Sequence, residues 1–97
     1  MTVADQSKHM SLELEVLDQL LGGPMKLSTL RKFFESDKRF VQAISGLLHG
    51  GDIEISDERQ SALPEWRWRR LIADGDLVAN VDELLADLTE QGARKVS

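Results

Sequence analysis

Polar and basic side chains recur along residues 37–49 outside an apolar stripe, and their types suit hydrogen bonding to an anionic polymer. They are Lys38, Arg39, Gln42, Ser45 and His49. Lysine and arginine pair with phosphate oxygens or with the edge of guanine, and glutamine can form two hydrogen bonds to adenine. The small side chains of Ala43 and Gly46 would let such a helix approach a second molecule closely. The other interpretation is an ordinary solvated helix face.

A second basic group, Arg59, Arg67 and Arg69, lies in a segment that we predict to form a hairpin. The guanidinium fork matches two phosphate oxygens and stays charged, so these side chains are candidates for contacts to a phosphate backbone. Nearby carboxylates offer a competing structural role as surface ion-pair partners. Those carboxylates are Asp52, Glu54, Asp57, Glu58 and Glu65. Trp66 and Trp68 alternate with the arginines, and we expect their shared strand face to be core and not a stacking platform for bases.

Residue types that perform catalysis or bind metals form no constellation in this sequence. The chain has no cysteine, which excludes disulfides and thiolate zinc sites. Its two histidines, His9 and His49, lie far apart in the sequence. The run Gly22-Gly23-Pro24 lacks the Gly-Lys-Ser/Thr ending of a phosphate-binding loop. We therefore expect a binding protein with no cofactor and no metal, and not an enzyme.

Charge is distributed unevenly along the 97 residues, whose formal net charge is −5. An acidic total counts against a nucleic-acid partner, because phosphate binding requires a concentration of Lys and Arg. Residues 26–49, however, carry five basic side chains against two acidic ones, whereas residues 71–97 carry six acidic against two basic. This asymmetry predicts two surfaces with different roles. Residues 1–10 lack the apolar run of a signal peptide and no stretch resembles a membrane span, so we expect a cytoplasmic protein.

Hydrophobic periodicity predicts three helices in the first half of the chain. Residues 1–10 are polar and aperiodic, and we expect a flexible tail there. A first helix should begin at Ser11 and stop at Gly22-Gly23-Pro24, a second should be capped by Ser28, and a third should cover residues 37–49. Their inward positions are Leu14, Leu17, Leu20 and Leu21, then Leu30, Phe33 and Phe34, then Phe40, Val41, Ile44, Leu47 and Leu48.

The hydrophobic pattern then changes from helical to alternating. Residues 53–55 alternate apolar and acidic side chains, which is typical of a half-buried strand, and residues 57–61 have the polar composition of a turn. Residues 62–72 are predicted to be the second arm of a hairpin. A final amphipathic helix, ended at Gly92, is expected from an apolar stripe. That stripe consists of Val81, Leu84, Leu85 and Leu88.

This order of a helix, a minimal strand, two helices and a hairpin resembles the winged helix-turn-helix superfamily, from Ser11 to about Ile72. The resemblance is carried by Gly22-Gly23-Pro24-Met25-Lys26-Leu27-Ser28, where the family pairs a tiny strand with its wing, and by the packing positions Val41, Ile44, Leu47, Gly51 and Ile53. We therefore expect a mainly helical α+β domain at residues 11–76, with a three-helix core and a β-hairpin wing. An amphipathic C-terminal helix and tail should follow at residues 77–97.

The resemblance implies that the third helix lies in the major groove of double-stranded DNA and that the hairpin touches the backbone. It implies a transcriptional regulator of prokaryotic or phage type that recognises its site with Lys38, Arg39, Gln42 and Ser45 and anchors its wing with Arg59. The C-terminal stripe either closes the core or serves as a dimerisation arm, as is common in relatives of this kind, and a homodimer would suit a palindromic site. The alternative is a winged-helix interaction module that binds protein, which the overall acidity favours.

Overall fold

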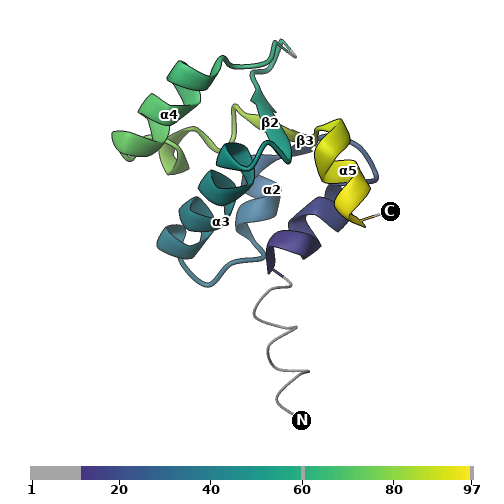
Figure 1. Cartoon of the computed structure of the whole chain (residues 1–97). Helices are drawn as coiled ribbons and strands as arrows, with labels where there is room; N and C mark the ends of the chain where they lie inside the picture. Colours follow the sequence, from purple (N-terminus) through teal and green to yellow (C-terminus); the bar gives the residue numbers. More distant parts are fainter. Residues whose placement is uncertain (1–11, 60, 97) are drawn as a thin grey trace.

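The computed structural model describes residues 12–59 and 61–96, and helices alternate with short strands along them (Figure 1). The first helix covers residues 12–20. It is followed by strand β1 (Met25–Lys26), helices α2 (Leu27–Arg31) and α3 (Asp37–His49), strand β2 (Ile53–Ser56), helix α4 (Glu65–Ala73), the 3-10 helix η1 (Val78–Asn80), strand β3 (Leu85–Leu88) and helix α5 (Glu90–Val96). The fold is α+β and mainly helical, as predicted. The expected tail at residues 1–10 and the cap at Ser11 lie outside the described residues.

The helices expected in the first half of the chain are confirmed, with one change at the start of α2. The Oγ of Ser36 accepts a 3.2 Å hydrogen bond from a backbone N–H in the first turn of α3 and caps that helix. Ser28 is not a cap, because α2 already begins at Leu27. The N–H of Leu27 donates to the carbonyl oxygen of Leu84 at 2.9 Å. The N–H of Ser28 donates to that of Val81 at 3.0 Å, so a distant segment satisfies groups that a capping side chain would otherwise satisfy.

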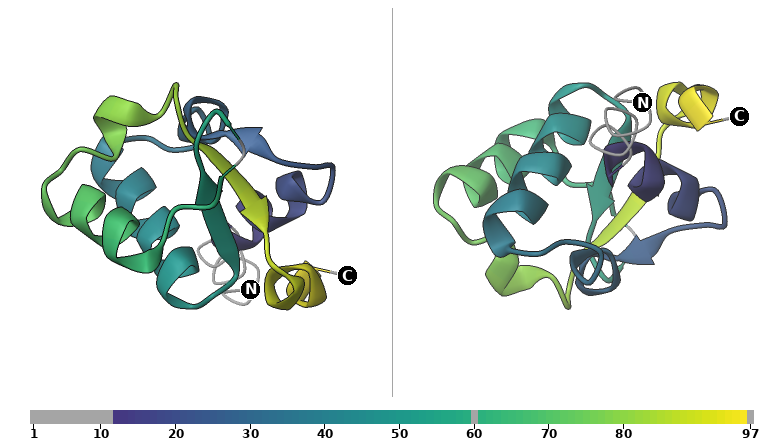
Figure 2. Two further views of the ribbon diagram at one scale, coloured as in Figure 1. Left: turned by 90° about the horizontal axis from the view of Figure 1, so that it is seen from above. Right: turned by 90° about the horizontal axis from the view of Figure 1, so that it is seen from below.

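The strands form one antiparallel sheet in the order β1-β3-β2, so the last strand in the sequence is the central one. Strand β2 is half-buried as predicted, with Ile53 and Ile55 inside and Glu54 exposed. Ala86 of β3 lies opposite Ile55 on one side and opposite Met25 of β1 on the other. Figure 2 shows β3 beside β2, with α5 near one end of the sheet. Strands β1 and β2 are therefore neighbours of β3 and not of each other.

The predicted second hairpin arm at residues 62–72 is wrong, because most of this segment belongs to helix α4. The chain reverses direction after β2 as expected, where the N–H of Asp57 donates to the carbonyl oxygen of Ser61 at 3.0 Å, and among the described residues it returns along β2 for one isolated bridge, between Ser56 and Ala62. Pro64 then stands at the N-cap of α4. Proline has no N–H to continue a strand ladder, and its fixed backbone angle is compatible with the start of a helix. The wing as predicted is therefore reduced to one bridge.

Helix α4 places its two tryptophans on different sides, which corrects the expectation of a shared face. Residues two positions apart in a helix are rotated by about 200° about its axis. Trp68 is 7% exposed and belongs to the core, whereas Trp66 is 66% exposed. Leu71 and Ile72 are partly buried against the same core as Trp68, at the three- and four-residue spacing that is typical of a helix face.

The predicted amphipathic helix near the C-terminal end is wrong over residues 81–88. Its second half is strand β3, and helix α5 begins at Glu90 and includes Gly92, the expected stop. The members of the apolar stripe consequently differ in burial. Leu84 is buried in the core, and the other three are partly buried: Val81, Leu85 and Leu88. The dimerisation arm loses this helical basis, and a homodimer stays a prediction.

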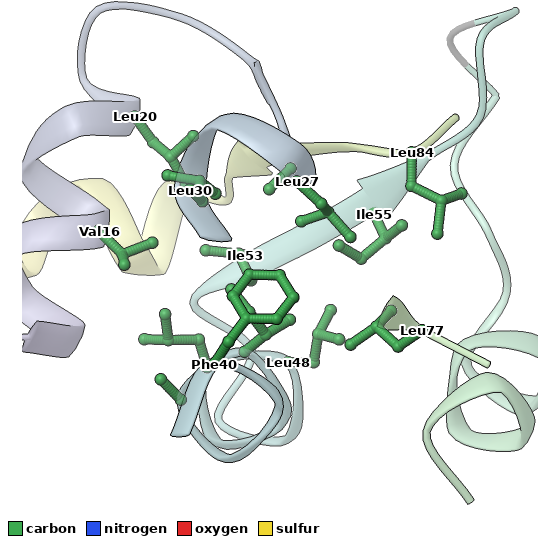
Figure 3. Close-up of a cluster of buried hydrophobic side chains, with 14 of the residues drawn as sticks. Val16, Leu20, Leu27, Leu30, Phe40, Leu48, Ile53, Ile55, Leu77 and Leu84 are labelled. Atoms are coloured by element: carbon green, nitrogen blue, oxygen red, sulfur yellow. The ribbon is translucent and has the colours of Figure 1, made fainter. Parts of the chain in front are cut away.

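Side chains from the helices and the sheet meet in one core (Figure 3). Its most deeply buried members are Val16, Leu17, Leu20, Leu27, Leu30, Phe40, Ile44, Leu47, Ile55 and Leu77. Leu77 and Leu84 lie beyond the predicted boundary at residue 76 and still belong to this core, so that boundary does not divide it. Leu14, Leu21 and Phe33, which were expected to face inward, are exposed.

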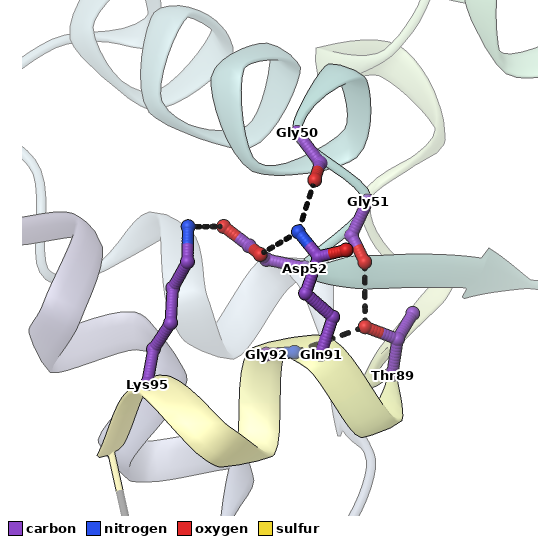
Figure 4. A network of polar contacts seen from close by, with 7 residues as sticks. All are labelled: Gly50, Gly51, Asp52, Thr89, Gln91, Gly92 and Lys95. Carbon is purple, nitrogen blue, oxygen red and sulfur yellow. Dashed lines mark hydrogen bonds and ion pairs between the residues drawn. The ribbon is translucent and has the colours of Figure 1, made fainter.

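Asp52, the residue before β2, has a buried carboxylate that bonds to side chains of α5 (Figure 4). Asp52 is 4% exposed. Its Oδ2 lies 2.9 Å from Nζ of Lys95, and its Oδ1 accepts a 3.0 Å hydrogen bond from Nε2 of Gln91. The hydroxyl of Thr89 donates to the carbonyl oxygen of Gly51 at 2.6 Å. Charge-assisted and neutral hydrogen bonds therefore fix α5 against the turn that follows α3.

Candidate nucleic-acid interface

Helix α3 presents the predicted contact residues on the side that faces away from the core. Lys38, Gln42 and Ser45 are spaced by four and three residues and so form one stripe. Lys38 and Gln42 are exposed, and Ser45 is half-buried. Arg39 is exposed at the neighbouring edge of the helix, where it lines a small cleft of about 130 Å³ together with Gln42 and Glu13. The structure therefore brings these four predicted residues together on one helix.

The exposed side chains of this face have no partner within the described part of the chain. Lys38, Arg39 and Gln42 make neither an ion pair nor a side-chain hydrogen bond with any residue of 12–59 or 61–96. Glu13 of the first helix reaches over Gly46, where its Oε2 would lie 3.7 Å from an added Cβ. The cationic groups are thus available to a ligand, and the carboxylate of Glu13, in the cleft that Arg39 lines, limits the positive field there.

The first turn of α3 is held in place by Arg31, which the sequence analysis did not single out. Nε of Arg31 lies 2.5 Å from Oδ1 of Asp37, and its Nη1 donates to the carbonyl oxygen of Phe34 at 3.0 Å. Together with the Ser36 cap, these contacts fix the first turn of α3, which carries the side chain of Lys38. No sequence signal reveals Arg31, because its partner lies six residues away across a break between two helices, where helical periodicity does not apply.

His49, in the last turn of α3, takes part in an intramolecular stack. Its ring lies edge-on to the indole of Trp68, with the centroids 5.1 Å apart and the planes at 82°. The guanidinium of Arg69 lies 5.5 Å from the centroid of the same indole, and its Nε is 2.6 Å from Oε2 of Glu65. Helix α4 accordingly lies beside α3 in Figures 1 and 2. The contact between His49 and Trp68 therefore joins α3 to α4, whereas the contacts of Arg69 lie within α4.

Arg59 and Arg67 lie elsewhere, and the structure does not bring them to the α3 face. They line an open pocket of about 400 Å³ between the turn after β2 and helix α4. No residue of this pocket also lines the cleft at Arg39. The predicted site is therefore divided in two, because the strand that would have carried these arginines past α3 is a helix.

Ion pairing distinguishes Arg69 and Arg70 of α4 from Lys38 and Arg39 of α3. On α4, Arg69 pairs with Glu65, and Arg70 lies 3.8 Å from a carboxylate oxygen of Asp74. These are pairs along a helix, in place of the cross-strand pairs that were expected. Exposed pairs of this kind stabilise a protein little, but they neutralise charge locally. Lys38 and Arg39 on the first turn of α3 thus carry positive charge that has no carboxylate partner among the described residues.

Acidic and histidine side chains do not gather into a metal site: among residues 12–59 and 61–96, no group of three His, Cys, Asp or Glu could hold an ion. Within the same described ranges, no helix is long and apolar enough to cross a membrane. Comparison of the chain with models of protein families, with characterised proteins and with solved structures found no match.

Proposed function

We propose that this chain is a winged helix-turn-helix protein that binds double-stranded DNA through the exposed face of α3, as a sequence-specific regulator of transcription in the cytoplasm. The observation that carries the proposal is the state of Lys38, Arg39 and Gln42. Their side chains project from the first two turns of a capped helix and are exposed. They have no ion-pair or hydrogen-bond partner among the described residues. Phosphate oxygens and base edges are the partners that these three side-chain types fit.

The arrangement of the elements supports this proposal. The resemblance implies a minimal strand that pairs with a wing, and here β1 pairs with the returning strand in the order β1-β3-β2. The connection from β2 to β3, residues 57–84, would then be an enlarged wing that contains α4. Helix α3 has 13 residues. The major groove is about 12 Å wide and admits one such helix, whose diameter with side chains is about 10 to 12 Å.

The position of the candidate residues along α3 also fits the proposal. In helix-turn-helix proteins the N-terminal residues of the recognition helix contact the base edges. Lys38, Arg39 and Gln42 occupy this half of α3. The net charge of −5 does not oppose binding at this place, because screening at physiological salt confines the effect of exposed charges to about 8 Å.

The proposal is tested by selecting duplexes from a random library with the full chain and measuring affinity by fluorescence anisotropy at several salt concentrations. Lys38→Gln should reduce the magnitude of the slope of log K against log salt by about one, because one phosphate contact is lost. Lys26→Gln on β1 is the matched control, since Lys26 is also exposed and has no ion-pair partner in the described ranges. Absence of salt-dependent binding to any duplex at micromolar protein, or an equal effect of both variants, would overturn the proposal.

A protein-binding module is the second candidate, and the exposure of Trp66 favours it. Trp66 is the most exposed large apolar side chain among the described residues, at 66%. Arg69 and Arg70 of the same helix are paired with carboxylates, and tryptophan often anchors protein interfaces. A partner protein that binds the wild type and Lys38→Gln but not Trp66→Ala would favour this function over DNA binding.

A further inference from the structure

A pocket lies where three segments of the connection between β2 and β3 meet. Its volume of about 400 Å³ falls within the range of about 300 to 1,000 Å³ that is usual for small-molecule sites. One wall is the turn at residues 57–59 together with Leu63, and a second is formed by Arg67 and Leu71 of α4. Asn80 and the residues that lead into β3 form the third.

Each of the three walls contributes one leucine to the pocket. Leu63 and Leu84 are buried, and Leu71 is half-buried. Their side chains also belong to or pack against the main core, so their positions are fixed by the fold. A ligand that places an aliphatic or aromatic group against them removes its own apolar surface and the exposed part of Leu71 from water, which is the main favourable term in such binding.

Charged groups of both signs line the same pocket without neutralising one another. Arg59 and Arg67 bring guanidinium groups, and Glu58 and Glu83 bring carboxylates. None of these four side chains is in an ion pair with a described residue. The two arginines that follow on α4 both have carboxylate partners. The pocket therefore holds cations and anions apart at its rim.

The two remaining polar residues of the pocket already have partners. Oδ1 of Asp57 accepts hydrogen bonds from the N–H groups of Arg59 and Ser61, at 2.9 and 3.0 Å, which stabilises the turn. Nδ2 of Asn80 donates to the carbonyl oxygen of Asp76 at 2.7 Å. Two guanidiniums, two carboxylates and three leucines therefore remain for a ligand, together with the second carboxylate oxygen of Asp57 and the amide oxygen of Asn80.

We propose that this pocket binds a free α-amino acid with an apolar side chain. Arg67 binds the ligand carboxylate with the two-pronged geometry that guanidinium favours, and Glu83 holds the α-ammonium group. The side chain of the ligand packs against the leucines, and the turn residues Glu58 and Arg59 line the mouth. A zwitterion satisfies both signs of charge at once, which a simple anion or cation does not. The proposal does not depend on DNA binding, and its test reads ligand binding directly.

Isothermal titration calorimetry of the full chain with L-leucine and L-phenylalanine tests the ligand class. At least one of them should bind saturably, with one site per chain and a Kd below about 1 mM. Hexanoate and hexylamine each keep an apolar body and one of the two charges, and each should bind at least about tenfold more weakly. No saturable binding of either amino acid up to about 10 mM, or equal affinity for hexanoate, would overturn the proposal.

Substitutions test the assignment of the two ends of the ligand. Arg67→Gln and Glu83→Gln should each weaken amino-acid binding at least about tenfold, because each removes one charge-assisted contact. Arg70→Gln is the matched control, since it removes the same charge from the same helix outside the pocket. Far-UV circular dichroism checks that the variants fold. If Arg67→Gln does not fold, Arg67→Lys replaces it, because lysine keeps the charge but cannot make the two-pronged contact. Equal effects at Arg67 and Arg70 would overturn the proposal.

Discussion

The backbone carbonyl oxygen of Asp52 lies so close to Gly92 that a Cβ on this glycine would stand 2.0 Å from it. A contact of that length is impossible, so α5 crosses the start of β2 at a distance that only glycine allows. Gly92→Ala should destabilise the protein by about 1 to 3 kcal/mol, because α5 must move and its contacts with the sheet must rearrange. Urea unfolding monitored by circular dichroism measures the change.

Gly46→Ala is a control that should raise the free energy of unfolding, whereas Gly92→Ala should lower it. An added Cβ at Gly46 would meet only the carboxylate of Glu13, at ordinary contact distances of 3.7 to 4.0 Å. Alanine is favoured over glycine inside a helix by about 1 kcal/mol, so this variant should be up to that amount more stable. Equal stabilisation by both substitutions would show that the close approach at Gly92 is not a constraint in solution.

The buried carboxylate of Asp52 should contribute more to stability than the exposed carboxylate of Glu90 on α5. Asp52→Ala removes the acceptor for Lys95 and Gln91 and should cost about 1.5 to 3 kcal/mol, as expected for hydrogen bonds to a charged group. Glu90→Gln disturbs an exposed pair with Arg94 and should change the free energy of unfolding by about 0.5 kcal/mol or less. Chemical denaturation of both variants makes the comparison, and similar losses would contradict it.

The two tryptophans should differ sharply in their effect on stability. Trp68→Ala removes a buried indole and its contact with His49, and should cost about 3 to 5 kcal/mol. Trp66→Ala changes an exposed position and should alter stability by about 0.5 kcal/mol or less. Fluorescence adds an independent check: the variant that keeps only Trp68 should emit at shorter wavelength than a fully hydrated indole. Emission of a hydrated indole from that variant would exclude the described packing of α4.

Arg39 should contribute to sequence discrimination if α3 enters a major groove. Arg39→Ala is expected to weaken binding to the selected duplex by about 1 to 3 kcal/mol and to relax the preference at one base pair. Arg69→Gln serves as the comparison, because Arg69 already pairs with Glu65 and stacks on Trp68. Repeating the library selection with both variants measures the preference, and an unchanged base preference with Arg39→Ala would assign this side chain to a phosphate or to no contact.

The first half of the fold could be predicted because its signals are local and agree with one another. Along α3, the Ser36 cap, the apolar stripe and the glycines that follow indicate the same helix, and the structure places its ends within the predicted range. The alternation at residues 53–55 is likewise a property of neighbours in the sequence. The positions of the candidate residues on α3 follow from these elements, so the exposed stripe could be found without coordinates.

The second half could not be predicted because short apolar runs fit both a helix and a strand. Trp66 and Trp68 alternate with arginines as in a strand, but Trp68, Leu71 and Ile72 pack as a helix face. The run at residues 84–88 fits a helical stripe, but it becomes a strand because β1 and β2 supply hydrogen bonds on both sides. The error at α4 also misplaced Arg67, since a strand and a helix direct the same residue to different neighbours.

The central position of β3 has a consequence for the order in which the molecule can be assembled. Proteins are synthesised from the N-terminus, and β1 and β2 leave the ribosome before β3. Until residues 85–88 arrive, neither earlier strand has the partner that it bonds in the finished sheet, and the N–H groups of Leu27 and Ser28 lack their acceptors as well. The helices can pack early around Phe40, but the sheet cannot form until β3 has been synthesised. Helix α5 follows β3 in the sequence, so it is attached at the same late stage.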